Sequence, residues 1–200
     1  VQSLAGDVIV VWSYNYTIAV RITGTTTVAS GWPASGRYLS PNGGSYYPVA
    51  VSDGQGGALV AWQQSSNGSD IFGSHVGASG NIVLGYSSSG SPLCSIVGEQ
   101  VSPVITTDGL GGALVAWNDS RSGDADIYVQ RMMPNSATGV GWPVNGAPLS
   151  AVFGVAQSQP VIAADLLGQL QRPAPGKDRQ SAQEQTLGVR EQGIRPVDCG

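Results

Sequence analysis

The segment "DGQGGALVAW" runs from Asp53 to Trp62, and "DGLGGALVAW" runs from Asp108 to Trp117, fifty-five positions later. The alignment extends back to Pro48 and Pro103, and 11 of its 15 paired positions are identical. A repeat of this length is typical of folds in which each copy forms one unit that buries its apolar surface against its neighbours. The fold is therefore expected to be a series of similar units.

Looser copies flank these two segments. "GDVIVVW" ends at Trp12, and "PVIAAD" begins at Pro160. The repeat period is thus 50 to 57 residues, with the variation taken up in loops. We expect units at about residues 1–45, 46–100 and 101–157, followed by the start of a fourth unit at 158–165.

Each complete unit contains four candidate strands. In the second unit the first three are Val49–Ser52, Ala58–Trp62 and Ile71–Val76, and the fourth is expected near Ile82–Tyr86. The second strand is apolar at every position, which predicts a strand buried on both faces. No segment carries a sustained helical stripe of apolar residues with caps. The sequence therefore predicts an all-β fold.

The loops between the first and second strands have the composition of tight turns. Glycine supplies positive φ angles there, and an aspartate side chain accepts hydrogen bonds from nearby backbone N–H groups. These residues recur in both complete units, which favours a structural role over a catalytic one. The predicted turn residues are Asp53, Gly54, Gly56, Gly57, Asp108, Gly109, Gly111 and Gly112.

Four antiparallel strands per unit of about fifty residues are typical of a β-propeller blade. The main alternative is a β-sandwich, which does not require so regular a repeat. The first unit lacks its first strand and the fourth offers only that strand, so we expect twelve strands in an open arc of about three blades. Because propellers close with four to eight blades, the remaining blades are expected in a longer chain.

Residues 166–200 differ from the repeats in composition. They contain no aromatic residue, six Gln and nine of the chain's 22 charged residues. Such a segment buries little apolar surface, so we expect a poorly ordered tail. A shift of reading frame is an alternative explanation, because the change falls in the middle of a motif.

Composition excludes two classes of partner. The net charge is −4 and the chain has a single Lys, whereas nucleic-acid binding requires clustered cations. No stretch approaches the length of apolar sequence needed to span a membrane. The polar surface is expected to come mainly from uncharged side chains, since charged residues make up only 11% of the chain.

The segments "SDGQGGALVAW", "NDSRSGDADIYVQR" and "GWPVNGAPLS" resemble the repeats of large secreted bacterial β-propeller proteins. The resemblance covers about residues 1–165. It implies a secreted or cell-surface protein of several blades, of a kind whose activity is usually unassigned. We expect the chain to act as a binding or structural module, with a glycan or a protein as its ligand. A more distant similarity to sialidase-like propellers implies the alternative of a carbohydrate-active enzyme with its catalytic residues in other blades.

Two sets of residues are candidates for binding. Oxygen-bearing side chains gather in one loop, as hard cations such as Ca²⁺ require, although the spacing is not that of an EF-hand. This candidate metal set is Asn118, Asp119, Asp124 and Asp126. The aromatic residues Trp32, Tyr86 and Trp142 recur at loop positions and are candidates for stacking on a ligand, with packing between units as the alternative.

The single histidine and one cysteine occupy repeat positions held by other residues elsewhere. His75 stands where the first and third units have Arg21 and Arg131. Cys94 stands where they have serine, which predicts a small buried side chain. Neither is expected to be catalytic, and apart from Ca²⁺ no cofactor is expected.

Overall fold

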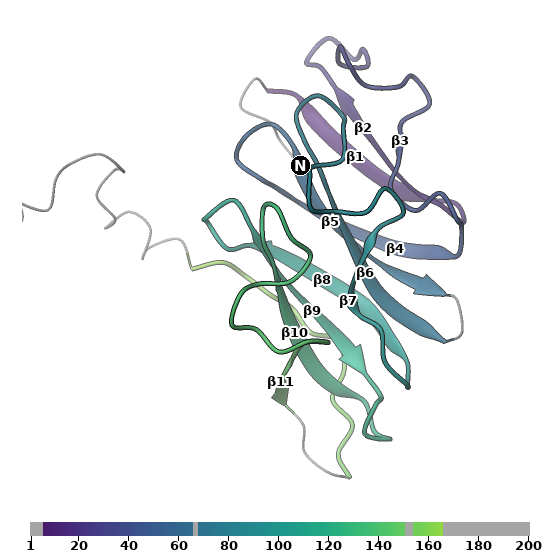
Figure 1. Ribbon diagram of the computed structural model, residues 1–200, viewed down its shortest axis with the longest axis vertical. Helices are drawn as coiled ribbons and strands as arrows, with labels where there is room; N and C mark the ends of the chain where they lie inside the picture. Colours follow the sequence, from purple (N-terminus) through teal and green to yellow (C-terminus); the bar gives the residue numbers. More distant parts are fainter. Residues whose placement is uncertain (1–5, 66–67, 151–153, 166–200) are drawn as a thin grey trace, which may run out of the picture. The chain divides into compact units, whose positions relative to one another are not determined.

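The computed structural model describes residues 6–65, 68–150 and 154–165. Within these ranges the chain forms strands and no helix, which confirms the predicted all-β fold (Figure 1). The first sheet contains β1 (Val8–Ser13), β2 (Thr17–Ile22) and β3 (Arg37–Tyr38). The second contains β4 (Ser45–Ser52), β5 (Ala58–Ser65), β6 (Ser69–Val76) and β7 (Ser91–Cys94), and the third contains β8 (Gln100–Thr107), β9 (Ala113–Asp119), β10 (Asp126–Met132) and β11 (Ala147–Ser150).

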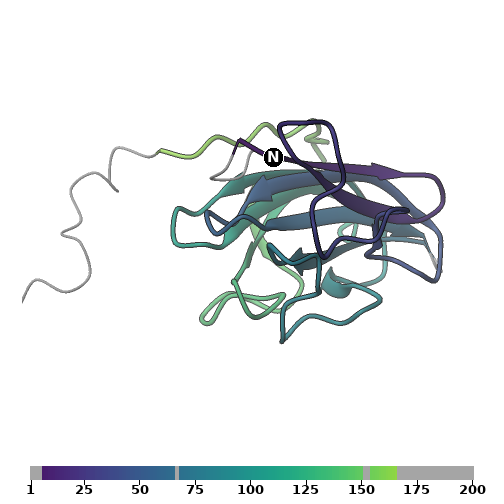
Figure 2. The same cartoon turned by 90° about the horizontal axis from the view of Figure 1, so that it is seen from above.

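Each sheet is a run of antiparallel strands in chain order. The sheet orders are β1-β2-β3, β4-β5-β6-β7 and β8-β9-β10-β11, so no strand crosses from one sheet to another. Each sheet corresponds to one sequence repeat, and the first has three strands, as expected. The sheets follow one another in chain order down Figure 1, and they overlap one another in the view from above (Figure 2).

Strand β5 explains why the repeated segment is apolar throughout. Its alternate residues Ala58, Val60 and Trp62 pack in one core cluster together with residues of the first sheet. Leu59 and Ala61 pack in a second cluster with residues of the third sheet. Residues from Ala58 to Trp62 are all fully buried. The predicted burial of both faces is confirmed, and neighbouring sheets supply the cover.

The Asp-Gly turns hold the first two strands of a unit together. Asp53 Oδ1 accepts hydrogen bonds from the backbone N–H groups of Gln55, at 2.7 Å, and Gly57, at 2.9 Å. Gly54 and Gly56 adopt φ angles of 75° and 92°, which glycine adopts without strain. The third unit repeats the turn, with Asp108 Oδ1 bonded to Leu110 N and Gly112 N at 2.7 and 2.8 Å.

Strands β4 and β8 each contain a bulge next to a proline. The register of β4 on β5 shifts between Tyr46 and Val49, and that of β8 on β9 shifts between Val101 and Val104. Tyr47 and Ser102 sit at these shifts with φ angles of 52° and 56°. Proline is tolerated in a strand at such a bulge because no ladder hydrogen bond is needed there.

The start of the fourth unit repeats this backbone feature without joining a sheet. Gln159 precedes Pro160 and has a φ angle of 59°, close to those of Tyr47 and Ser102. Residues 160–164 have no strand partner among the described residues. The expected count of twelve strands is therefore wrong by one, because a first strand needs the second strand of its own unit to form a ladder.

The fourth strand of the unit also lies elsewhere than expected. Residues 82–86 form a loop, in which Ile82 makes an isolated bridge to Val76, and the fourth strand is β7 at Ser91–Cys94. The prediction near Ile82–Tyr86 is wrong because Tyr86 turns out of the sheet. Its hydroxyl donates hydrogen bonds to the third unit instead.

By its internal contacts the chain divides into two parts, Val1–Ala164 and Asp165–Gly200, and all three sheets belong to the first part. The tail predicted at residues 166–200 lies outside the described residues, as does Cys199. Cys94 is a free, buried thiol. In the part of the chain that the structure describes, no helix has the length and apolar character needed to cross a membrane.

Candidate functional site

A cation and a carboxylate pair at the same place in each sheet. Arg21 lies 2.9 Å from Asp7 in the first sheet, and Arg131 lies 2.6 Å from Asp108 in the third. In the second sheet His75 Nε2 lies 2.8 Å from Asp53 Oδ2. In each pair the aspartate comes shortly before the second strand of its unit (β1, β5 or β9). The basic residue lies in the third strand (β2, β6 or β10).

Sequence reasoning placed His75 in series with the two arginines but assigned it no acidic partner, and the structure corrects that interpretation. The register of β5 on β6 pairs Leu59 with His75, and this brings the imidazole back beside the Asp53 turn. The sequence did contain a sign of this contact, because an aspartate before the second strand and a basic residue in the third strand recur together in each unit. In the antiparallel β5–β6 hairpin the start of β5 lies beside the end of β6. The repeated aspartates and the repeated basic residues are therefore the two partners of one interaction.

The cations also reach the next sheet. Arg21 Nη1 donates a hydrogen bond to the carbonyl of Ala78 at 3.1 Å. His75 Nδ1 lies 2.6 Å from the carbonyl of Pro134, which occupies the same repeat position in the third unit. A carbonyl only accepts, so the contact with Pro134 requires Nδ1 to donate. Both ring nitrogens are therefore occupied by structural contacts.

The carboxylate of Asp53 is stabilised in its charged form. Burial acts to raise its pKa, but the hydrogen bond with His75 and those from the backbone N–H groups of Gln55 and Gly57 outweigh burial and lower the pKa below its ordinary value. A carboxylate held in this way is not poised to accept a proton near neutral pH. The contacts of Asp53 thus fit a structural role.

Two of the three recurring aromatic residues lie where two sheets meet. Trp32 is buried, and its Nε1 donates to the Ala78 carbonyl at 2.9 Å. Tyr86 is buried, and its hydroxyl donates to the carbonyls of Met133 and Ser136 at 2.6 and 2.7 Å. Trp142 is partly exposed on the third unit. The first two rings are in contact with protein on the seam between sheets.

We call these two contact regions the first seam, between the first and second sheets, and the second seam, between the second and third. In each seam an aromatic residue and a cation of one unit donate to the loop that follows the third strand of the next unit. The acceptors are Ala78 in the first seam and Met133, Pro134 and Ser136 in the second.

The residues of the candidate metal set have separate partners. Asn118 Oδ1 accepts from Gln159 N at 3.2 Å, and Asp124 Oδ2 accepts from Gly154 N at 3.1 Å. Asp126 Oδ2 accepts from Ser122 Oγ at 2.5 Å. Among the described residues, no three His, Cys, Asp or Glu side chains are close enough together to hold a metal ion.

Asp119, the fourth member of that set, is part of a buried polar cluster. Its carboxylate accepts from Trp117 Nε1 at 2.8 Å and from Arg121 Nε at 2.8 Å. The Arg121 guanidinium also lies over the Tyr128 ring, 3.9 Å from its centroid, and donates to the carbonyl of Asn145. Burial raises the pKa of Asp119, but the hydrogen bonds from Arg121 and Trp117 outweigh it, so the pKa is lowered.

Cys94 adjoins this cluster, and its surroundings suppress thiolate formation. Burial raises the pKa of the thiol to about 12, despite the opposing charge of Arg121. Since the thiolate is the reactive form, Cys94 is a poor nucleophile at neutral pH. Its position matches the small buried residue that the repeat indicates.

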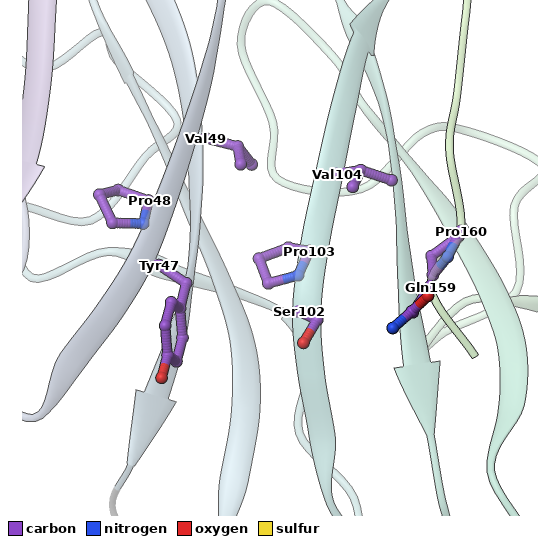
Figure 3. A pocket seen from close by; sticks show the side chains of 8 residues that line it. All are labelled: Tyr47, Pro48, Val49, Ser102, Pro103, Val104, Gln159 and Pro160. Carbon is purple, nitrogen blue, oxygen red and sulfur yellow. The ribbon is translucent and has the colours of Figure 1, made fainter.

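A groove runs across the first strands of successive units. It has a volume of about 410 Å³ and is lined by residues at equivalent repeat positions (Figure 3). They form three rows: Tyr47, Pro48 and Val49 from β4; Ser102, Pro103 and Val104 from β8; and Gln159 and Pro160 from the start of the fourth unit. We call this surface the first-strand groove.

The first-strand groove is mainly apolar but carries hydrogen-bonding groups along one side. Figure 3 shows the Tyr47 hydroxyl, the Ser102 hydroxyl and the Gln159 amide, one from each row. The Tyr47 side chain is 68% exposed. An apolar floor with a few polar groups is typical of ligand-binding surfaces in proteins. Sequence reasoning missed this groove because Tyr47, Ser102 and Gln159 share a backbone conformation and not a residue type.

A second cleft, of about 470 Å³, lies between the two Asp-Gly turns. Its lining consists of residues 51–55 from one turn and of Thr107, Gly109, Leu110 and Gly111 from the other. Asp53 is the one ionisable residue in its lining, and its carboxylate is fully engaged by His75 and the turn. The cleft therefore presents mainly backbone and small side chains.

Comparison with known proteins adds no identification. No family model matches the chain, and neither curated protein sequences nor solved structures gave a match.

Proposed function

We propose that the three sheets are successive blades of a β-propeller and that the chain is a secreted or cell-surface module that binds a glycan or a protein ligand in the first-strand groove. Support for the propeller comes from the one-repeat, one-sheet correspondence and from the contact of β4 with β8, which brings the first strands of two units side by side. The bacterial propeller repeats that the sequence resembles support export.

The observation that carries the binding proposal is the first-strand groove itself. Its lining comes from equivalent positions of three units, so an extended ligand meets a periodic series of apolar and polar groups. A polysaccharide or an extended peptide has a matching periodicity. Tyr47 provides an exposed aromatic face of the kind that stacks on sugar rings or on prolines.

The repeated charged residues do not favour the alternative of a sialidase-like enzyme. Arg21, His75 and Arg131 are each paired with a carboxylate of their own sheet. A hydrolase of that class would need cations and acids directed toward a bound sugar. In the described residues these groups are engaged in structure.

The test is to screen the full chain on a glycan array and on an array of extended peptides. We expect binding to at least one class, and we expect Tyr47→Ala to weaken it about tenfold or more. Tyr38→Ala is the matched control, because Tyr38 is an exposed tyrosine on strand β3, outside the groove. This substitution is expected to leave binding unchanged. No binding on either array, or equal loss in both variants, would contradict the proposal.

Fluorogenic glycosides test the enzyme alternative in the same preparation. Turnover that a single carboxylate substitution abolishes would replace the binding proposal with the enzymatic one. We expect no turnover above background.

A further inference from the structure

Each seam is formed by two different faces, one from each of the neighbouring sheets. The first sheet exposes one of these two kinds of face, and the third sheet exposes the other. On the first sheet, Val8, Val10 and Trp12 are 43%, 45% and 37% exposed. Their repeat equivalents Ala58, Val60 and Trp62 are fully buried in the first seam. This face of β1 therefore has the apolar pattern that, in the second unit, packs against the preceding unit. We call the surface formed by Val8, Val10 and Trp12 the leading face.

The third sheet exposes the opposite half. Leu114 and Ile127 lie on the face of β9 and β10 that points away from the second sheet, and both are partly exposed. Arg131 and Trp142 occupy the positions of the two seam donors. Among the described residues, Arg131 bonds Asp108 but no carbonyl of a following unit, and Trp142 Nε1 has no acceptor. We call this surface the trailing face.

The polar acceptors of a seam are also present on the first unit. In the second unit, the Ala78 acceptor loop is closed by hydrogen bonds from Gly77 N to Asn81 O and from Gly80 N to Gly77 O, both 2.9 Å. The first unit has the same loop, with Thr23 N to Thr27 O at 2.8 Å and Thr26 N to Thr23 O at 2.9 Å. Gly24 stands at the repeat position of Ala78 and is exposed.

The two loops also share their backbone conformation. Thr26 adopts a φ angle of 66°, and Gly80, at the equivalent position, adopts 78°. A β-branched residue rarely adopts a positive φ, so the loop keeps this shape against the preference of its own residue. The leading end of the chain thus carries both the apolar face and the carbonyl loop that a seam requires.

We propose that two copies of this chain associate head to tail, the trailing face of one copy packing on the leading face of the next as in the two internal seams. Val8, Val10 and Trp12 cover Leu114 and Ile127, while Arg131 and Trp142 donate to the Gly24 carbonyl of the second copy. The occupant is a second copy because the chain already packs this pair of faces against each other twice. The proposal is independent of the ligand in the first-strand groove.

A head-to-tail interface uses different surfaces on its two partners, so each copy keeps one face for a further copy. The association is therefore expected to continue beyond dimers, into a ring or an open array. A symmetric dimer, in contrast, would use the same face on both copies and stop at two.

Sedimentation velocity of the full chain over a range of concentrations is the test. We expect the mean mass to rise with concentration beyond that of a dimer. Val10→Asp on the leading face and Leu114→Lys on the trailing face are each expected to give a monomer. The matched control is Leu84→Asp, on a loop residue that is 93% exposed, and it is expected to associate like the parent chain.

A mixture of the two face variants makes the test specific. Val10→Asp keeps an intact trailing face and Leu114→Lys keeps an intact leading face, so the mixture is expected to associate, whereas each variant alone stays monomeric. Circular dichroism of each variant establishes that it is folded. A folded parent chain that stays monomeric at all concentrations would overturn the proposal, and so would variants that fail to recombine on mixing.

Trp142→Ala tests the polar half of the interface separately. Loss of a donor and a packed ring at the trailing face is expected to weaken association about tenfold or more. An unchanged mass distribution in this variant would contradict the equivalence of Trp142 with Trp32 and Tyr86.

Discussion

The first and second seams have the same geometry and different chemistry. In the first, a guanidinium and an indole, from Arg21 and Trp32, donate to the single carbonyl of Ala78. In the second, an imidazole and a phenol, from His75 and Tyr86, donate to three carbonyls of the same loop in the next unit. The repeat therefore preserves the directions of donor and acceptor more strictly than the residues that provide them.

The charged groups of the second seam have a consequence for its stability. The second seam contains two carboxylates whose pKa is lowered in the folded protein, that of Asp53 and that of the buried Asp119 beside Arg121. The stability of this seam is therefore expected to fall as the pH drops through the range in which these carboxylates become protonated.

The largest effect is expected from removing the tryptophan at the centre of a seam. Trp62→Ala and Trp117→Ala each delete a fully buried ring and are expected to lower the free energy of unfolding by about 3–5 kcal/mol. Trp117→Ala has the larger effect of the two, because the hydrogen bond that it removes is made to the buried carboxylate of Asp119, whereas that of Trp62 is made to the partly buried side chain of Gln64. Urea denaturation followed by circular dichroism measures both.

Trp12→Ala is the matched control for this pair. Trp12 occupies the same repeat position but is 37% exposed, so it is expected to have a clearly smaller effect. An equal loss in all three variants would contradict the assignment of the two buried rings to seams.

A smaller loss is expected from filling the space beneath the Asp-Gly turn. A Cβ atom at Gly57 would meet both the Asp53 carboxylate and the Val76 carbonyl well inside van der Waals contact. Gly57→Ala is expected to destabilise by about 2–3 kcal/mol. Gly54→Ala is the control, since only its positive φ opposes the change, and it is expected to cost about 1 kcal/mol. Thermal unfolding gives both values, and a reversed order would contradict the turn geometry.

The pH dependence of the second seam comes next in size. Because the pKa of Asp53 is lower in the folded state than in the unfolded chain, its charge stabilises the fold above the unfolded pKa of about 3.9. This contribution is lost as the pH falls through the folded pKa. Asp53→Asn is expected to lower stability at pH 7 by about 1–3 kcal/mol and to reduce the further loss in acid.

Urea titrations of Asp53→Asn between neutral and acidic pH measure this effect. If the variant loses as much stability on acidification as the parent chain does, the charge of Asp53 is not a source of the pH dependence.

The smallest effect is expected when His75 is replaced by the residue that the other two units use. His75→Arg keeps a cation beside Asp53 and a donor toward Pro134, so the change in stability is expected to stay within about 1.5 kcal/mol. A variant that does not fold would show that the positions of Arg21, His75 and Arg131 are not interchangeable.

The sequence was sufficient to predict the sheets because their signal is local and repeated. The run from Ala58 to Trp62 has no polar residue, so a strand there needs cover on both faces. The position of β7 was not predictable in the same way. It is short, contains Pro92, and is defined by its pairing with β6 and not by its own composition.

The polar contacts depended on register, which the sequence does not show. Asp53 and His75 are 22 residues apart and were found as separate series, although each is evident at its own repeat position. The first-strand groove was also hidden. Its rows share a proline and a positive φ angle, while Tyr47, Ser102 and Gln159 have nothing in common as residue types.

The central claim is that each repeat folds into its own sheet and that equivalent residues join the sheets. Nuclear Overhauser contacts between backbone protons of the full chain measure strand order directly. The account predicts the antiparallel ladder pattern of contacts for β5 with β4 on one side and β6 on the other, and a contact of the Trp32 indole proton with Ala78. Strands from different repeats paired in one ladder would contradict it.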